Sequence, residues 1–167
     1  MIFYCLLLCL CINLNSMYRL NSLKEMKAFA GWMADKIKKA PGVCPGQSRK
    51  ALVLALSGDL GSGKTTFAQY FLRALGVKGK ITSPTFVIFK RYPLSLKSYA
   101  VAYHMDCYRI KNIKDLKAFD LRDVFNASQN IVLIEWPERI KKVLPKDTVW
   151  LNLEHGEKPN QRIVKIL

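Results

Sequence analysis

The fold of this chain is decided by residues 51–65, ALVLALSGDLGSGKT. The first six of these residues form a short apolar run with little alternation, which is typical of a strand covered on both faces. Residues 58–65 match the pattern G-x-x-x-x-G-K-[ST] in full, and the sequence that follows predicts a helix over residues 65–75 that ends at Gly76. A strand, a glycine loop and a helix in this order are the arrangement in which such a loop binds the phosphates of a nucleotide.

Each type of residue that the pattern requires has a physical reason. The three glycines allow positive φ angles and a close approach of the backbone to phosphate: they are Gly58, Gly61 and Gly63. We expect the backbone N–H groups from Gly61 to Thr65 to converge at the positive end of the helix. Lys64 brings a cation to the β- and γ-phosphates, and the Thr65 hydroxyl can ligate Mg²⁺. The loop therefore predicts a site for a nucleoside triphosphate with Mg²⁺.

A loop of this kind needs an acidic residue at the end of a neighbouring strand to hold the metal. Residues 131–135, IVLIE, supply four apolar residues followed by Glu135. Asp106 follows the strand predicted over residues 100–105, where it could hold a metal-bound water or orient the attacking water. Taken by itself, an aspartate at the end of a strand more often caps the next turn. His104 alternates onto the same face and is interpreted as a packing histidine.

The remaining pattern predicts an α/β domain. Residues 22–25, SLKE, fit a capping box that starts a helix running to about Ala40, and residues 41–50 carry turn signals typical of a loop. A second helix is predicted over residues 112–125, and further strands over residues 86–92, 150–153 and 162–166. Strands and helices interleave around a central sheet. The short connection after residue 92 and the hairpin-like ending indicate that part of this sheet is antiparallel.

Composition limits the classes of function. The 167 residues are 50% apolar, which suits one folded domain. The net charge of +15 favours acidic partners such as nucleotide or RNA. The basic residues are scattered, so a dedicated nucleic-acid arm is not expected. The five cysteines show no spacing that suits zinc and their number is odd, so reduced thiols are expected.

The N-terminus is strongly apolar over residues 2–12, IFYCLLLCLCI. This run is too short to cross a bilayer as a helix. It could be the apolar part of a signal peptide, yet no Lys or Arg precedes it and no clear cleavage site follows. We expect instead that translation begins at Met17, that residues 1–16 are upstream sequence, and that residues 17–167 form a single P-loop ATPase domain. That domain is expected to be cytoplasmic and not to associate with a membrane.

Four short segments occur together in this order: GDLGSGKTTF (58–67), SPTF (83–86), HMDCYR (104–109) and IEWPE (134–138). Through these segments the chain resembles the TsaE family, small ATPases needed for threonylcarbamoyl modification of tRNA adenosine. The resemblance implies a P-loop NTPase-like three-layer α/β domain with a mixed, partly antiparallel central sheet. It implies that the cofactors are ATP and Mg²⁺.

The resemblance also implies a site. The residues that would contact the nucleotide are Gly58, Gly61, Ser62, Gly63, Lys64, Thr65, Thr66 and Trp136. Thr65 and Glu135 would form the metal site, while Lys64, Asp106 and Glu135 would serve catalysis. Trp136 would lie near the nucleotide and report its binding by fluorescence. Residues 83–86 would act as a switch-like loop, although spacing alone favours an ordinary Ser-Pro turn.

The partners implied by the resemblance are the proteins TsaB and TsaD, on whose complex the chain would use ATP hydrolysis; contact with tRNA would be indirect or weak. Two alternatives stay open from the residues. One is a small-molecule or nucleotide kinase, since the same loop opens that class, although residues 92–99 are short for a lid. The other is a basic tRNA-binding module with a regulatory nucleotide site.

Overall fold

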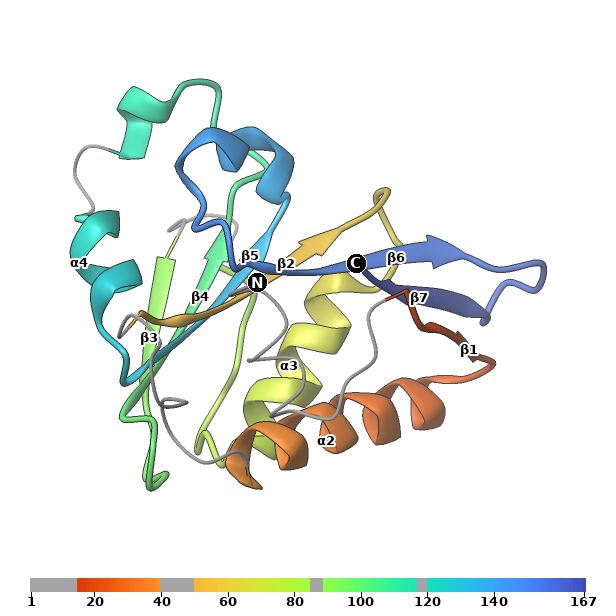
Figure 1. Cartoon of the computed structure of the whole chain (residues 1–167). Coiled ribbons are helices and arrows are strands. Elements are labelled where there is room, and N and C mark those ends of the chain that lie inside the picture. The colour runs from red at the N-terminus through yellow and green to blue at the C-terminus, as the bar shows by residue number, and fades with distance from the viewer. Residues whose placement is uncertain (1–14, 40–49, 85–88, 117–119) are drawn as a thin grey trace.

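The computed structural model describes residues 15–39, 50–84, 89–116 and 120–167, without the side chains of residues 113 and 114. One seven-stranded sheet, ordered β1-β7-β6-β2-β5-β4-β3, lies between helices on both faces (Figure 1). The strands are β1 (Met17–Leu20), β2 (Leu52–Ser57), β3 (Phe89–Pro93), β4 (Val101–Asp106), β5 (Asn130–Glu135), β6 (Val149–His155) and β7 (Arg162–Ile166). The α-helices are α2 (Leu23–Lys39), α3 (Lys64–Ala74) and α4 (Leu121–Asn126), and the 3₁₀ helices are η1 (Ile113–Leu116) and η2 (Pro137–Val143).

The sheet is mixed, as the sequence predicts. Its centre is parallel, because β2 pairs parallel with β5 and β6, and β5 pairs parallel with β4. Its two sides are antiparallel: β3 pairs with β4, β7 with β6, and β1 with β7. The carboxyl ends of four neighbouring parallel strands therefore meet at one edge of the sheet.

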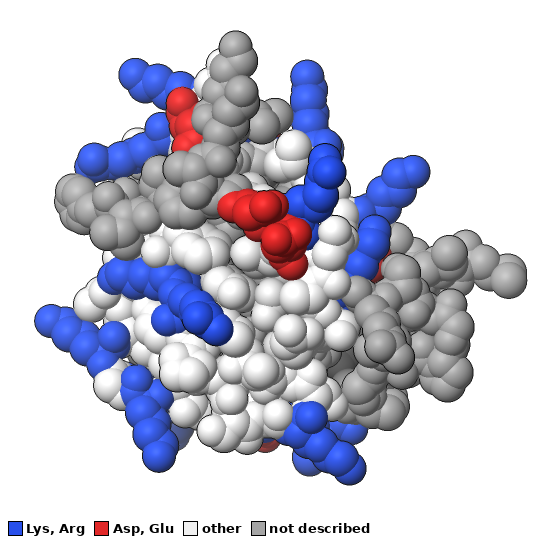
Figure 2. All heavy atoms as spheres, turned by 90° about the vertical axis from the view of Figure 1, so that its left-hand side faces the viewer, with Lys and Arg blue, Asp and Glu red and all other residues white. Residues whose placement is uncertain are grey.

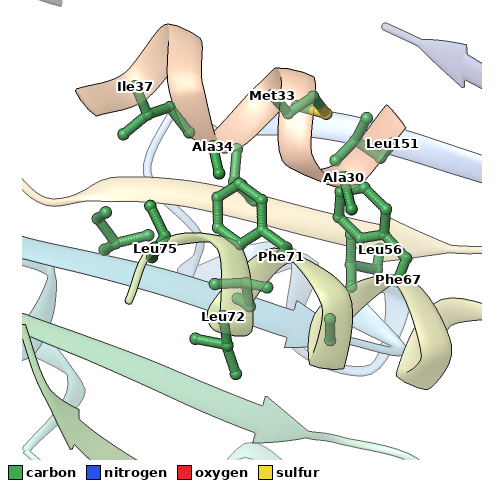
Figure 3. Packing of buried hydrophobic residues seen from close by; sticks show 14 of the residues in the cluster. Ala30, Met33, Ala34, Ile37, Leu56, Phe67, Phe71, Leu72, Leu75 and Leu151 are labelled. Atoms are coloured by element: carbon green, nitrogen blue, oxygen red, sulfur yellow. The ribbon is translucent and has the colours of Figure 1, made fainter. Parts of the chain in front are cut away.

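One face of the sheet is covered by α2 and α3, which lie side by side below it in Figure 1. Figure 3 shows the apolar cluster that they form with the sheet: its labelled members are Ala30, Met33, Ala34 and Ile37 of α2, Phe67, Phe71, Leu72 and Leu75 at α3, and Leu56 and Leu151 of the sheet. All ten are almost completely buried. Because α3 begins at Lys64, this packing fixes the helix that carries the end of the glycine loop.

The opposite face is covered by a second apolar cluster from short elements. Phe125 of α4, Leu116 of η1 and Ile140 of η2 pack against Val132 and Ile134 of β5. Alternate residues of β5 thus point to opposite faces, since Ile131 and Leu133 belong to the first cluster. The result is the three-layer arrangement expected for the domain.

The predicted N-terminal capping box is present, in a slightly shifted form. The Glu25 N–H donates to Ser22 Oγ at 3.2 Å, so Ser22 caps α2 as expected. The Glu25 carboxylate accepts from the N–H of Asn21 at 2.9 Å, one residue before the position that the usual motif uses. The N–H groups of both Asn21 and Glu25 thus have a side-chain acceptor at the start of α2.

The helix predicted over residues 112–125 is wrong as one continuous element, since the described residues form η1 and α4 instead. Two aspartates account for the break. Asp115 Oδ2 accepts from the N–H groups of Lys111 and Asn112, and Asp120 Oδ1 accepts from that of Asp123 as the N-cap of α4. Aspartate side chains bonded to nearby backbone favour caps and turns over a helix interior.

Other segments were either missed by the prediction or are only partly described. Strand β1 was not expected, and it extends the sheet through pairing with β7. Of the strand predicted over residues 86–92, only the part from Phe89 is described, and the loop over residues 41–50 lies outside the described residues except for its last residue. Within the described ranges, no helix is both long enough and apolar enough to pass through a membrane.

Candidate nucleotide-binding site

The predicted site residues lie where the parallel strands end. The glycine loop follows β2, and Glu135 is the last residue of β5, paired with Leu56 of β2. On the other side of β5, Asp106 is the last residue of β4 and stands directly opposite Glu135. Ligands of open α/β sheets bind at this edge, outside the carboxyl ends of the strands.

The backbone of the loop depends on glycine. Gly58, Gly61 and Gly63 have φ of 128°, 77° and 100°, all in the region that side chains rarely adopt. At Gly58 a Cβ atom would lie 2.0 Å from the carbonyl oxygen of Leu153 in β6, so only glycine fits there. Gly63 precedes α3, whose first N–H groups have no partner within the helix and face the loop as donors for an anion.

Lys64 is folded back onto its own loop. Its ammonium group donates to the carbonyl oxygens of Gly58 and Asp59, each at 2.7 Å. The same Nζ lies 4.0 Å from the centroid of the Trp136 ring, a distance at which a cation is attracted to the ring face. Burial lowers the pKa of Lys64 below its usual 10.5, and the negative charges of Glu135 and Glu138 oppose the shift. The loop carbonyls and the indole thus hold this cation.

Glu135 is the centre of a buried polar cluster. Its Oε2 accepts from the Thr65 hydroxyl at 2.6 Å, and its Oε1 lies 2.8 Å from Nε2 of His104. The side chains of both Glu135 and His104 are almost completely inaccessible to solvent. Thr65 and Glu135, the predicted metal ligands, are therefore in direct contact and present the oxygen donors that suit Mg²⁺.

Asp106 is buried, and its side chain shapes the turn after β4. Its Oδ1 accepts from the N–H of Tyr108 at 3.0 Å, which is the turn-capping role that its position at a strand end favours. The carboxylate nevertheless lines the pocket described below. The next residue, Cys107, is also buried; burial raises the pKa of its thiol to about 12, and the charges of Asp106 and Glu138 add to the rise. A thiol with that pKa is not a nucleophile near neutral pH.

Trp136 has an unusual backbone. Its φ of 58° and ψ of 50° are left-handed, and Pro137 follows it to begin η2. A non-glycine residue in this region carries strain of roughly 1–3 kcal/mol, and such residues cluster at ligand sites. The ring of Tyr108 packs against Trp136, with centroids 5.0 Å apart. The strained turn aims the indole over Lys64.

These residues surround a pocket of about 300 Å³, which is within the size range of small-molecule sites. It is lined by Leu60, Gly61, Gly63, Lys64, Thr65, Thr66, Asp106, Tyr108, Glu135 and Trp136. Two predicted site residues, Gly58 and Ser62, do not line this pocket. Gly58 packs against β6, and Ser62 is fully buried with its Oγ 3.4 Å from Lys64 Nζ.

Sequence reasoning missed the residues that support the loop from β6 and β7. His155 Nε2 lies 3.1 Å from the carbonyl oxygen of Leu60, and Arg162 donates to that of Gly61 at 3.1 Å. His155 and Arg162 are paired across the two strands. No local sequence signal marks them, because the contact joins positions about 100 residues apart. Tyr108 was also missed, although it lies within the HMDCYR segment.

The proposed switch loop is described only in part. Lys90 of β3 donates to Thr82 Oγ1 and to the carbonyl oxygens of Thr82 and Ser83, at 3.4 and 3.2 Å. This anchors the start of the loop to the sheet. Thr85 and Phe86 lie outside the described residues.

The chain was compared with known protein families and with curated proteins. Residues 18–164 match the model of the family described as threonylcarbamoyl adenosine biosynthesis protein TsaE. The chain belongs to the TsaE family. It is 34% identical over 139 residues to a curated relative in Rickettsia prowazekii, which covers 83% of this chain and 85% of that protein. It is 35% identical to one in Haemophilus influenzae over 108 residues, 65% of this chain and 66% of that protein. Both relatives are named tRNA threonylcarbamoyladenosine biosynthesis protein TsaE.

A solved structure supports the fold of this TsaE-family chain. The crystal structure of YdiB from Bacillus subtilis superimposes with a TM-score of 0.67 at 28% sequence identity. The superposition covers 90% of this chain and 82% of that one. The resemblance found in the four short segments is therefore confirmed over most of the chain.

Proposed function

We propose that this TsaE-family chain is a Mg²⁺-dependent ATPase that supports threonylcarbamoyl modification of tRNA adenosine by acting on a complex of TsaB and TsaD. The observation that carries the proposal is the 2.6 Å hydrogen bond from Thr65 to Glu135 in a pocket lined by the glycine loop. A hydroxyl directly after the loop lysine, joined to a strand-end carboxylate, is the ligand pair that P-loop enzymes use for Mg²⁺. The names of the curated relatives support the pathway.

Binding would begin with the phosphates replacing the carbonyls that now hold Lys64. The ammonium group needs only to turn from Gly58 and Asp59 toward the pocket, which it already lines. The N–H groups in the first turn of α3 and the backbone of Gly61 and Gly63 would complete an anion cradle. Trp136, whose ring lies over Lys64, would cover that side of the bound nucleotide.

Hydrolysis would use the two strand-end carboxylates in different roles. Thr65 and Glu135 would hold Mg²⁺, which when bound neutralises charge on the β- and γ-phosphates. Asp106, held by the Tyr108 N–H at 3.0 Å, would orient the attacking water and accept its proton. As the water oxygen bonds to the γ-phosphorus, the bond to the β–γ bridging oxygen would break, and Lys64 would stabilise the charge that develops on the β-phosphate of the departing ADP.

Turnover by the isolated chain is expected to be slow. Among the described residues that line the pocket, Lys64 is the one cation, and none is an arginine. In this class of enzyme an arginine supplied by a partner accelerates hydrolysis about 10³- to 10⁵-fold. A pocket that lacks this group favours stimulation by a partner, which is the regulation that we propose for TsaB and TsaD.

The test is ATP hydrolysis by the purified chain, alone and with TsaB and TsaD together. We expect slow release of inorganic phosphate alone and a clear increase with the pair. Labelled γ-phosphate identifies the acceptor in the same assay. Transfer of the label to a small molecule or nucleotide instead of water, or no response to the pair, would overturn the proposal and favour the kinase alternative.

A further inference from the structure

His104 has a contact that the ATPase proposal does not use. It is completely buried in β4, and its Nε2 lies 2.8 Å from Oε1 of Glu135. The two residues come from neighbouring parallel strands, in which Asp106, not His104, is the direct partner of Glu135. The contact is therefore a diagonal one that the lengths of these two side chains make possible.

The two oxygens of Glu135 are held by donors from different elements. The Thr65 hydroxyl at the start of α3 holds Oε2, and His104 holds Oε1. Glutamate has one more rotatable bond than the aspartate that many phosphate loops use at this position. An extra donor removes that freedom, because a carboxylate held at both oxygens can point in only one direction.

The second ring nitrogen of His104, Nδ1, makes no comparable contact with the described part of the chain. Nδ1 is buried and has no hydrogen-bond partner among the described residues. A buried polar atom without a partner disfavours folding, so an apolar residue of similar size would suit this position better if packing were its only role. The favourable contact of this side chain is the one to Glu135.

From this arrangement we propose that His104 is a positioning residue for the metal site: its Nε2–H fixes the Glu135 carboxylate so that it and Thr65 are oriented together for Mg²⁺ bound with nucleotide. Donors that hold a metal-ligating carboxylate contribute to metal affinity without touching the metal. The inference rests on the proposed function, because it requires a nucleotide–Mg²⁺ site at Thr65 and Glu135.

The test compares two variants of His104, one that keeps a hydrogen-bond donor and one that keeps only the side-chain volume. In His104→Gln, the side-chain amide can place an N–H near the position of Nε2. In His104→Leu, the volume is largely kept and the donor is lost. For each full-length protein, calorimetric titration gives the affinity for ATP in EDTA and at saturating Mg²⁺. The ratio of the two affinities measures the coupling between metal and nucleotide.

We expect the coupling to fall at least about tenfold in His104→Leu and to be largely restored in His104→Gln, with ATP affinity in EDTA near that of the wild type in both. A role in packing alone predicts changed thermal stability with wild-type coupling, and that result would overturn the inference. Wild-type protein without any Mg²⁺ coupling would instead overturn the proposed metal site.

A measurement on the wild-type protein keeps the test independent of how the variants fold. The chain has two histidines, so ¹⁵N–¹H NMR can assign the His104 ring by comparison with a His155→Gln variant. We expect a proton on Nε2 and a change in its shift when Mg²⁺ and nucleotide bind together. A proton on Nδ1 with a bare Nε2 would overturn the inference, because Nε2 could not then donate to Glu135.

Discussion

At the scale of single residues, Lys64 is the cation that we propose binds the phosphates of ATP. Its contacts with Gly58, Asp59 and Trp136 hold it beside the pocket, from where it needs only to turn to meet phosphate. Lys64→Ala removes this cation, and we expect ATP affinity to fall by at least about tenfold, since a charge-assisted hydrogen bond contributes about 1.5–3 kcal/mol. Lys78→Ala, which removes the same charge from an exposed residue after α3, should bind ATP as the wild type does. Calorimetry on both variants makes the comparison, and equal affinities would contradict the assignment.

The pKa of Lys64 gives a second expectation at this scale. Because burial lowers this pKa below 10.5, the folded protein releases a proton that the unfolded chain retains between the folded pKa and 10.5. The unfolded state then binds more protons, so the free energy of unfolding contributed by Lys64 should rise with pH across that window. Urea unfolding of the wild type and of Lys64→Met at several alkaline pH values isolates the contribution of Lys64 to the free energy of unfolding, since other groups titrate equally in both. A wild-type advantage that falls with rising pH would contradict the shift.

Sequence alone identified most of the pocket, because the decisive residues are local. Gly58 to Thr65 follow one strand, and Asp106 and Glu135 each end another, so the topology of a parallel sheet brings them together. His104 was taken for a packing residue because its partner is set by the register of β4 against β5, which no local pattern encodes.

At the scale of elements, the turn between β2 and α3 depends on a close approach to β6. Gly58→Ala places a Cβ atom 2.0 Å from the Leu153 carbonyl oxygen at a φ of 128°, so we expect the protein to lose more than about 2 kcal/mol of stability. Gly31→Ala is the matched change: it lies in α2, where a Cβ atom meets nothing within 4 Å, and should stabilise the helix by about 1 kcal/mol. Chemical denaturation measures both, and a stable Gly58→Ala protein would contradict the geometry.

The elements that the sequence predicted well have either one clear apolar face, as α2 has, or a continuous apolar run, as β5 has. The helix from Leu23 and the strand ending at Glu135 have strong apolar patterns and lie within two residues of their predicted ends. Strand β1 was missed because its four residues, at the edge of the sheet, alternate weakly and gain their order from pairing with β7. The segment around Asp115 and Asp120 was wrong because the aspartate side chains compete with the backbone for its N–H groups.

At the scale of the whole molecule, the net charge of +15 invites a role in tRNA binding. Figure 2 shows the basic side chains of one face spread apart over a mostly uncharged surface, with acidic residues near its centre. We therefore expect weak tRNA binding by the isolated chain, with an affinity that falls steeply between about 50 and about 200 mM salt and does not respond to ATP. Filter binding across a salt series, with and without Mg²⁺ and ATP, measures it. Tight binding that depends on ATP would favour the tRNA-binding alternative.

Hydrolysis at the edge formed by the glycine loop, Asp106 and Glu135 is tested most directly by Asp106→Asn. The amide keeps an oxygen that can accept from the Tyr108 N–H, so the turn is preserved while the charge of the proposed base is lost. The measurement is single-turnover phosphate release from ATP with Mg²⁺ by the wild type and the variant, both saturated with nucleotide as shown by calorimetry. We expect ATP affinity within about threefold of the wild type and a rate lowered about 10²-fold or more. Wild-type phosphate release from Asp106→Asn would contradict the site.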